Sequence, residues 1–435
     1  MSEFTRRDTL KMGAGAAALA AGSGLVAPRA ARAALNIQPE SGAKLRLLRW
    51  KRFVAGDETL WMENTKKFTQ TTGIPVRVDN ESWEDVRPKA AVAANIGAGP
   101  DIILGWYDDP HQYPDKLVDL SELADYLGNK YGGWYPVAES YGTSHGRWIG
   151  LPLGAAGACI VYRQSHVQAA GFDGVPGDTG GFLKLCQALH AKGTPAAFAL
   201  GNAVGDGNTW AHWILWSHGG KVVDKDGNVV INSDETRAAL EYAAELYKTF
   251  IPGTTSWLDG NNNKAFLAGK ISLTANGISI YYAAKTTNHP LTPDIYHANL
   301  PVGPVGHPAE LHLLTQAMVM GYTKYPNAAK AYLQFMWEKE QYEPWQEAAQ
   351  GYITQPLRAY EKNPVWTEDP KNTPYRDLVA RMQNNGYAGP LGYASAAVMA
   401  DYVVVNMVAE AASGARTPKQ AMERAQKRAE RYYKV

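Results

Sequence analysis

The chain has 435 residues, 45% of them hydrophobic and 20% charged, and its formal net charge is +1. A charge this close to neutral gives no electrostatic reason to expect binding to nucleic acid or to an anionic membrane. The length suits two or three globular domains, and the composition contains no low-complexity tract.

An export signal is predicted at the N-terminus. Arg6 and Arg7 are followed by a run of small and apolar residues from 12 to 27, and then by Ala31-Arg32-Ala33, a small-x-small cleavage site. This order is typical of a twin-arginine signal peptide cleaved near Ala33. The apolar run is shorter than the roughly 20 residues of a membrane span. We therefore expect a mature protein in the periplasm that begins near residue 34; the alternative is an amphipathic N-terminal helix.

Strands and helices alternate over the next part of the chain. Glycines at 73 and 97 end the two helical patterns. Strand, helix and strand in succession predict βαβ units and a mostly parallel sheet. The predicted strands are 45–49, 74–78 and 101–104, and the helices are 58–72 and 83–95.

Further elements follow, separated by joints rich in glycine, alanine and proline at 154–157 and 301–304. Such joints can absorb the backbone rotation of a hinge. Asp226-Gly227 predicts a hairpin over 221–231. The other predicted elements are helices at 117–127, 181–192, 234–249, 264–269, 327–338 and 417–433, and strands at 158–162 and 271–275.

The two cysteines, Cys159 and Cys186, fall on a predicted strand and a predicted helix. We interpret them as buried free thiols, although an oxidising compartment permits a bridge. The chain has 13 Trp and 24 Tyr against 9 Phe. Trp and Tyr combine an apolar face with a polar group, which suits recognition of partly hydroxylated ligands such as sugars. Core packing accounts for most of them.

Several short motifs occur in a fixed order along nearly the whole mature chain. They are Ala98-Gly99-Pro100-Asp101-Ile102-Ile103, Gly150-Leu151-Pro152-Leu153, Val161-Tyr162, Ala170-Gly171-Phe172, Phe266-Leu267-Ala268-Gly269-Lys270, Asn276-Gly277, Leu300-Pro301 and Gly303-Pro304. In this order the chain resembles the extracellular solute-binding proteins of ABC importers, in the maltose-binding-protein-like sugar branch.

The resemblance implies an α/β fold of the periplasmic-binding-protein type II. Each of two lobes would hold a mostly parallel sheet flanked by helices. Lobe one would comprise 34–153 and 302–351, and lobe two 157–299 and 353–435, with hinge segments at 154–157, 299–303 and 351–353. It also implies a monomer that binds a carbohydrate-like solute without turnover or cofactor, and that delivers it to ABC permease subunits in the inner membrane.

Catalytic alternatives are weaker. Gly142-Thr143-Ser144-His145-Gly146 matches the nucleophile elbow of serine hydrolases, but no buried strand precedes it and no helix follows, so we interpret it as a surface turn. Asp224-Lys225-Asp226-Gly227 fails as a calcium loop. His307 and His312 are poorly spaced for a metal site, and no zinc or phosphate-loop motif occurs. A glycosidase pair among Asp108, Asp109 and Asp259 stays open.

Candidate ligand contacts follow predicted strands, because ligands bind at the carboxyl edge of open α/β sheets. The resemblance assigns an aromatic and an acidic contact to Trp106 and to Asp108 or Asp109; for Asp109 a cap beside Pro110 is the alternative. For Trp210 the alternative is the core, and for Asn208 a helix cap. The complete set is Trp50, Lys51, Arg52, Trp106, Asp108, Asp109, Asn208, Trp210, Trp257, Asp259, Asn276, Ser279, Tyr281, His312, Gln316, Tyr352 and Arg358.

Two departures from the maltose binder bear on the ligand. A stacking Trp is missing near Ser279, and Ala156 stands where that protein has an acidic contact. Both favour a monosaccharide, a polyol or a small glycoside. Lys51, Arg52 and His312 leave room for an anionic group on it. The alternatives are a polyamine, an amino-acid derivative or an organic anion in the same fold, or an exported hydrolase.

Overall fold

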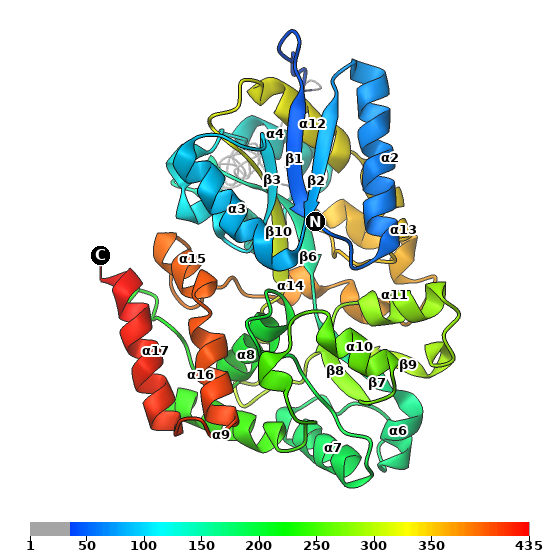
Figure 1. Ribbon diagram of the computed structural model, residues 1–435, viewed down its shortest axis with the longest axis vertical. Coiled ribbons are helices and arrows are strands. Elements are labelled where there is room, and N and C mark those ends of the chain that lie inside the picture. Colours follow the sequence, from blue (N-terminus) through cyan, green and yellow to red (C-terminus); the bar gives the residue numbers. More distant parts are fainter. Residues whose placement is uncertain (1–34, 435) are drawn as a thin grey trace, which may run out of the picture. The chain divides into compact units, whose positions relative to one another are not determined.

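The computed structural model describes residues 35–434. The predicted export signal at 1–33 lies outside these residues. Two sheets organise the chain from Ile37 onward (Figure 1). We refer to the five-stranded sheet with its helices as the first lobe, and to the three-stranded sheet with its helices as the second lobe.

The five-stranded sheet of the first lobe has the order β2-β1-β3-β10-β6. β1 (Leu45–Trp50) pairs in parallel with β2 (Val76–Glu81) and β3 (Ile102–Trp106). β10 (Leu313–Val319) runs antiparallel to both β3 and β6 (Leu151–Ala156). The predicted βαβ start is confirmed, but the sheet is mixed rather than mostly parallel. β10 comes from a segment about 200 residues later in the chain than β3. An apolar sequence run does not reveal whether its strand will pair in parallel or antiparallel.

Helices cover this sheet and bury aromatic side chains against each other. Trp61 of α2 lies edge-on to Trp337 and Trp345, with ring centroids 6.4 and 5.9 Å apart. α2 ends at Gly73, whose φ of 74° lets its N–H reach Thr69 O at 2.8 Å. The helices are α2 (Ala55–Thr72), α3 (Trp83–Ile96), α4 (Ser121–Lys130), α5 (Pro136–Gly142), α12 (Pro326–Trp337) and α13 (Lys339–Ala348).

The three-stranded sheet of the second lobe places β7 (Cys159–Arg163) between β8 (Leu273–Asn276) and β9 (Ile295–Ala298). Both pairings are antiparallel, so the prediction of a mostly parallel sheet is wrong for these strands. Parallel pairing takes the form of isolated bridges, such as those from Ala196 to Leu273 and Phe250. The helices are α6 (Gln164–Ala169), α7 (Thr179–Ala191), α8 (Asp206–Ser217), α9 (Asp234–Tyr247), α10 (Asn261–Leu267) and α11 (Ser279–Thr286).

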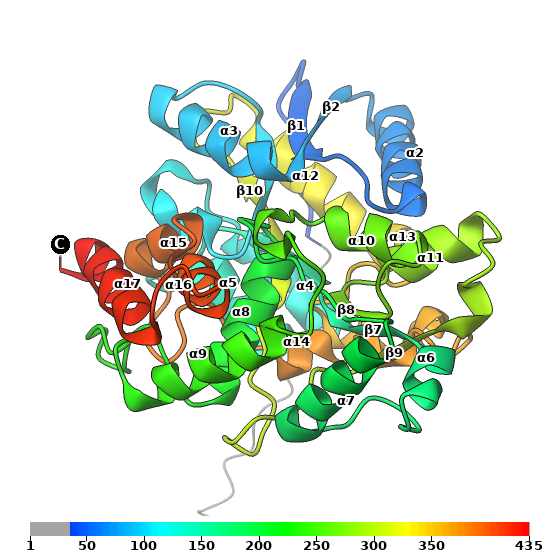
Figure 2. The ribbon, with the colours of Figure 1, turned by 60° about the horizontal axis from the view of Figure 1, so that its bottom comes forward.

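The C-terminal helices are α14 (Leu378–Arg381), α15 (Tyr393–Ala400), α16 (Val403–Ala412) and α17 (Pro418–Tyr433). α16 packs against α8, α9 and α17, and Figure 2 shows these four side by side. Within the described residues, 393–412 is one stretch apolar and long enough to cross a membrane. Tyr402 breaks it with a φ of 50°, and most of it is buried inside the protein. We interpret α15 and α16 as core helices.

Two turns carry motifs that imitate catalytic or metal sites. Ser144 belongs to a hairpin of β4 (Thr143–Ser144) and β5 (Arg147–Trp148), so the predicted surface turn is confirmed. Asp224 N–H donates to Asn228 O at 3.0 Å, which confirms the hairpin predicted over 221–231.

Cys159 and Cys186 are buried free thiols, as predicted. Short 3-10 helices complete the fold: η1 (Asp109–Gln112), η2 (Pro114–Lys116), η3 (Thr254–Ser256), η4 (Thr292–Asp294), η5 (Arg358–Lys362), η6 (Pro364–Trp366) and η7 (Thr373–Tyr375).

Three chain segments cross between the two sheets. Ala155 and Thr354 exchange backbone hydrogen bonds of 2.9 and 2.8 Å where two of the segments meet. Gly154 has a φ of 135°, and a Cβ there would lie 2.2 Å from Thr354 O, so only glycine fits this crossing. The chain after the third segment first returns to the first lobe, since Tyr135 N–H donates to Pro356 O and Tyr360 Oη to Trp337 O.

Candidate functional site

A cavity between the two lobes encloses about 380 Å³, including its open mouth. The first lobe contributes Phe53 and Trp83, and the second lobe contributes the start of α8 and the ends of β8 and α11. The crossing segment Ala156-Gly157-Ala158 forms the back of the cavity. Small side chains there leave room for a ligand beside the hinge.

The aromatic wall of the cavity rests on two further indoles. Trp83 stacks on Trp106 with ring centroids 4.6 Å apart and planes 20° from parallel, and Trp50 follows at 5.2 Å from Trp106. Trp50 and Trp106 are completely buried, whereas Trp83 and Phe53 line the cavity. The predicted contacts Trp50 and Trp106 therefore support the wall from behind. Trp106 Nε1–H also donates to Trp83 O, which fixes the start of α3.

Two carboxylates form the acidic part of the lining. Asp259 accepts hydrogen bonds from Gly205 N–H at 3.0 Å and from Asp206 N–H at 2.7 Å, at the N-terminus of α8. Asp206 Oδ2 accepts from Asn262 Nδ2–H at 2.7 Å. In the described part of the chain, Asp206 Oδ1 accepts no hydrogen bond, although the residue is only 9% exposed.

Burial dominates the electrostatics of this pair. It raises the pKa of Asp259 to about 6; the backbone N–H groups at the helix start lower that pKa, and the nearby Glu84 raises it. Burial raises the pKa of Asp206 well above its ordinary value, and the charge of Asp259 adds to that shift. Two such carboxylates in one cavity favour a bound proton or a bound cation.

Amide and hydroxyl groups complete the polar lining. Asn276 follows β8, and its Nδ2–H donates to Asn263 Oδ1. Asn263 Nδ2–H in turn donates to Ser279 Oγ at 2.9 Å. Tyr352 is 5% exposed and lines the cavity, and among residues 35–434 its hydroxyl has no hydrogen-bond partner. These groups can bind the hydroxyls of a ligand.

Of the predicted site residues, Asp259, Asn276, Ser279 and Tyr352 line the cavity together. Asp206, Thr209, Trp83 and Phe53 also line it and were missing from the prediction. Trp83 and Asp206 are the first residues of α3 and α8, respectively. Polar or aromatic residues at predicted helix starts are the signal that would have found them.

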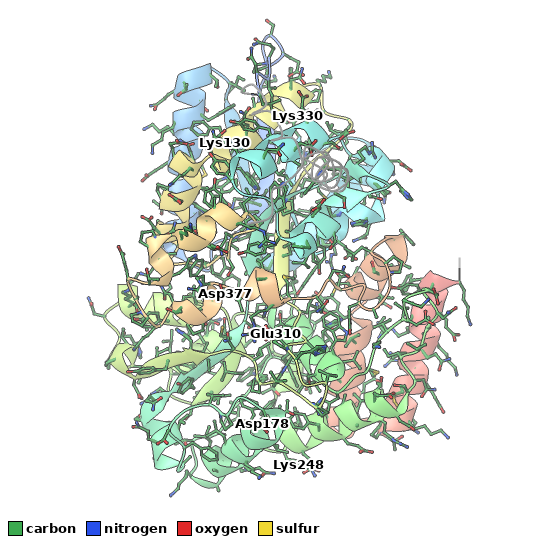
Figure 3. The ribbon with its side chains drawn as sticks, turned by 180° about the vertical axis from the view of Figure 1, so that it is seen from behind. Lys130, Asp178, Lys248, Glu310, Lys330 and Asp377 are labelled. Atoms are coloured by element: carbon green, nitrogen blue, oxygen red, sulfur yellow. The ribbon has the colours of Figure 1, made fainter. Side chains whose placement is uncertain are left out.

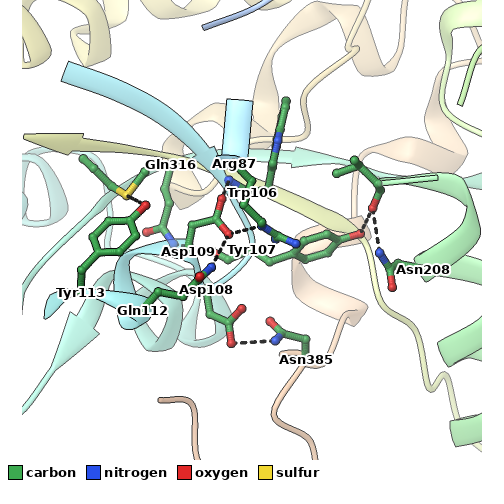
Figure 4. A network of polar contacts seen from close by, with 12 residues as sticks. Arg87, Trp106, Tyr107, Asp108, Asp109, Gln112, Tyr113, Asn208, Gln316 and Asn385 are labelled. Atoms are coloured by element: carbon green, nitrogen blue, oxygen red, sulfur yellow. Dashed lines mark hydrogen bonds and ion pairs between the residues drawn. The ribbon is translucent and has the colours of Figure 1, made fainter. Parts of the chain in front are cut away.

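Asp108 and Asp109 have other partners (Figure 4). Asp109 accepts from Arg87 Nε–H at 2.6 Å and from Trp106 N–H at 2.9 Å. Asp108 accepts from Asn385 Nδ2–H and Ser395 Oγ–H, both at 2.7 Å, and so anchors the segment before α15 to the first lobe. Burial raises the pKa of Asp108 to about 6, against the lowering effect of these two hydrogen bonds. Neither residue lines the cavity.

Asn208 and Gln316 lie in the same region of Figure 4. Tyr107 Oη–H and Asn208 Nδ2–H both donate to Val204 O, at 3.0 and 3.1 Å. Tyr107 comes from the first lobe and Val204 from the second, so this carbonyl joins the lobes. Gln316 Nε2–H donates to Tyr107 O and is buried in the five-stranded sheet.

Three predicted aromatic contacts lie elsewhere. Trp210 is fully buried, and its Nε1–H donates to Ala199 O at 2.6 Å, which places it in the core of the second lobe. Tyr281 Oη–H donates to Asp369 at 2.7 Å. Trp257 is half-buried, and its carbonyl accepts from Gly201 N–H. The position of Trp210 on α8 did not by itself indicate whether its side chain would face the cavity or the core.

The predicted cationic contacts also lie away from the cavity. Lys51 and Arg52 are exposed, and Arg52 pairs with Glu58 at 3.4 Å. Arg358 stacks over Tyr135, 4.7 Å from the ring centroid. His312 is buried between the lobes, where its Nδ1 accepts from Ala158 N–H and its Nε2 donates to Glu310 at 3.1 Å. Figure 3 shows Glu310 between the two lobes, and Arg381 also binds it. His312 therefore belongs to the crossing segments.

Comparisons with known proteins place these observations in a wider context. A family model described as bacterial extracellular solute-binding protein matches residues 63–374. The fold is similar to maltose-bound MalE3 of T. maritima, with a TM-score of 0.77, 19% identity and 89% of this chain and 99% of that one covered. A comparison with curated sequences gives no match. Among residues 35–434 we find no cluster of three or more His, Cys, Asp or Glu placed to hold a metal ion.

Two further structures share the fold. A sugar transporter from Arthrobacter chlorophenolicus A6 with bound laminaribiose has a TM-score of 0.76 and 20% identity, over 90% of this chain and 99% of that one. The GacH receptor of Streptomyces glaucescens GLA.O, solved unliganded and with acarbose, has a TM-score of 0.75 and 15% identity, over 91% and 99%. At these identities the similarity is one of fold.

Proposed function

This chain belongs to the bacterial extracellular solute-binding proteins, and on this premise we propose that it captures a carbohydrate-like solute between its lobes and delivers it to an ABC permease. The family is one of binding proteins that act outside the cytoplasm. The protein is an α/β fold of two lobes and mixed sheets.

The observation that carries the proposal is the chemistry of the interlobe cavity. Phe53 and Trp83 offer aromatic faces to the C–H patches of a sugar, and Asp259, Asn276 and Ser279 offer acceptors and donors to its hydroxyls. The solved complexes of similar fold, with maltose and laminaribiose, support a carbohydrate ligand. The missing stacking Trp near Ser279, and Ala156 in place of an acidic contact, favour a monosaccharide, a polyol or a small glycoside.

The mechanism is binding with lobe closure. The lobes correspond to 34–153 with 302–351 and to 157–299 with 353–435, with residues 356–360 reassigned to the first lobe because of their contacts with Tyr135 and Trp337. Tyr282 Oη accepts from Gly56 N–H at 2.8 Å across the lobes. A ligand that touches both lobes favours this closed arrangement through its higher affinity for it. The closed monomer then docks on the permease in the inner membrane.

Export by the twin-arginine signal at 1–33 completes the proposal, with the mature protein in the periplasm. On this route the two lobes fold in the cytoplasm before the protein is exported.

A screen of sugars, polyols and glycosides by thermal shift and calorimetry tests the function. We expect at least one compound of this class to raise the melting temperature and to bind one per chain, with no product detectable by chromatography. Binding confined to compounds without hydroxyl-bearing carbon frames would overturn the carbohydrate proposal, and product formation would overturn binding without turnover.

A further inference from the structure

We propose that the solute carries a protonated amine, as in an amino sugar or an amino-bearing polyol, and that Asp206 with Asp259 binds the ammonium group. This inference rests on the proposed function and deepens it. It reverses the expectation of an anionic group, since the cations on which that expectation depended lie outside the cavity.

The charged side chains of the cavity lining are all acidic. Asp206 and Asp259 line it, and the described lining residues include no Lys, Arg or His. Glu84 on α3 adds a third negative charge close to Asp259. Two cations of the first lobe are already paired, Arg87 with Asp109 at 2.6 Å and Arg49 with Asp57 at 2.5 Å. The cavity therefore offers uncompensated negative charge to its ligand.

The two carboxylates are not equally compensated. Asp259 receives backbone N–H groups at the start of α8, where the helix dipole also favours a negative charge. Asp206 receives a single neutral amide, from Asn262, and its Oδ1 has no donor among the described residues. A buried carboxylate with one free oxygen needs a charged donor more than a neutral hydroxyl, because charge-assisted hydrogen bonds are roughly twice as strong as neutral ones.

The remaining lining fits an ammonium group as well. Tyr352 is nine-tenths buried or more and lines the same cavity as Asp206, and its hydroxyl has no hydrogen-bond partner among residues 35–434. The rings of Phe53, Trp83 and Tyr352 provide faces that attract a cation within about 6 Å. A hydroxylated ring with one amine would satisfy the aromatic wall, the amides and the acidic pair together.

Binding of an amine should also release a proton. Burial raises the pKa of both carboxylates, that of Asp259 to about 6, and the charges of Glu84 on Asp259 and of Asp259 on Asp206 raise them further. Tyr107, Tyr352, Tyr375 and Tyr402 interact electrostatically with the pair from neighbouring elements, and so does Glu84. The empty pair thus holds a proton near neutral pH, and an ammonium ion replaces it. A neutral sugar leaves the proton in place.

The experiment compares matched forms of the same sugar by calorimetry: glucose, glucosamine, N-acetylglucosamine and gluconate, with the corresponding galactose series. We expect the amine to bind about tenfold or more tightly than its parent and its N-acetyl form. Its heat should depend on the ionisation enthalpy of the buffer, which reports proton release. This second measurement uses the unaltered protein and does not depend on any variant folding.

Asp206→Asn is the matched variant, with Asp226→Asn on the exposed hairpin as its control. We expect Asp206→Asn to abolish the preference for the amine and the proton release, and Asp226→Asn to leave both unchanged. Equal binding of the amine and the N-acetyl form, tightest binding of gluconate, or an unchanged preference in Asp206→Asn would overturn the inference while the carbohydrate function stands.

The outcomes for the proposed function differ. If no sugar in any form binds but simple alkylamines do, the carbohydrate function fails while the ammonium site stands. If neither sugars nor alkylamines bind, both are overturned.

Discussion

The indole of Trp83 stacks on that of Trp106 at 4.6 Å, and only Trp83 reaches the interlobe cavity. Trp106 lies at the end of β3, the position where ligand contacts of α/β sheets are expected. Its side chain points into the core of the first lobe and holds Trp83 in place instead. Trp83 therefore lines the cavity and Trp106 supports it, so substitutions of the two residues should have different effects.

Trp83→Ala should weaken ligand binding by about tenfold or more, because it removes the main aromatic face of the cavity. Trp83→Phe, the matched control, keeps a ring at that position and should lose only a fewfold. Calorimetry with the solute found in the screen measures both. Equal affinities of Trp83→Ala and the unaltered protein would remove Trp83 from the site.

The pair of Arg49 and Asp57 is fully buried and should contribute strongly to stability. Asp57 also accepts from Trp50 Nε1–H at 3.1 Å and from Trp345 Nε1–H at 3.0 Å. Asp57→Ala leaves Arg49 charged and unpaired, and should lower the free energy of unfolding by about 3–5 kcal/mol. Urea titration measures this loss.

The control is Asp79→Ala, which breaks partly exposed pairs with Arg46 and Arg77. It should cost about 1 kcal/mol or less. Similar losses in the two variants would contradict the special role of the buried pair.

Asp108 should make the protein less stable as the pH rises. Its folded pKa of about 6 exceeds the ordinary value near 4, so the folded state binds the proton more tightly than the unfolded state. The resulting stabilisation, on the order of 3 kcal/mol, is complete below about pH 4 and lost as the pH rises through 6. Asp108→Asn should flatten this part of the pH profile in urea titrations between pH 4 and 8. An unchanged profile would contradict the assignment.

Gly154→Ala should destabilise the crossing segments. The φ of 135° and the approach of 2.2 Å to Thr354 O leave no room for a methyl group. We expect a loss well above 1 kcal/mol, since strain and a steric clash add. Gly177→Ala is the control, because no atom lies within 4 Å of its Cβ position and its φ is not in the left-handed region. Thermal unfolding of both variants measures the difference.

Tyr282→Phe should weaken binding without touching the ligand. The variant loses the hydrogen bond from Gly56 N–H across the lobes, worth about 1 kcal/mol, or a factor of about five in affinity. Tyr296→Phe, at a 40% exposed tyrosine on β9, should have no effect. Calorimetry measures the affinities, and X-ray scattering measures the population of closed molecules. A full retention of affinity in Tyr282→Phe would exclude a role for this bond in closure.

Strong local patterns made much of the fold predictable. The periodic helices and short apolar strands between 45 and 106, the terminal helix and the hairpin at 221–231 appear within a few residues of their predicted places. β10 was missed, since its run reads equally well as a buried helix turn until its partners β3 and β6 are known. Four of the predicted site residues line the cavity, because strand and helix ends do meet there.

By itself the sequence determined the family resemblance, the strands and helices between 45 and 106, and the small residues at 154–157 that the crossing requires. Only the tertiary structure decided which side chains face the cavity and which charges accompany them. Position on a strand fixes the edge of the sheet that a residue reaches, but packing turns the side chain toward cavity or core. Thus Trp106 stacks on Trp83 and Asp109 pairs with Arg87, while Asp206 lines the cavity and its Oδ1 accepts no hydrogen bond among residues 35–434.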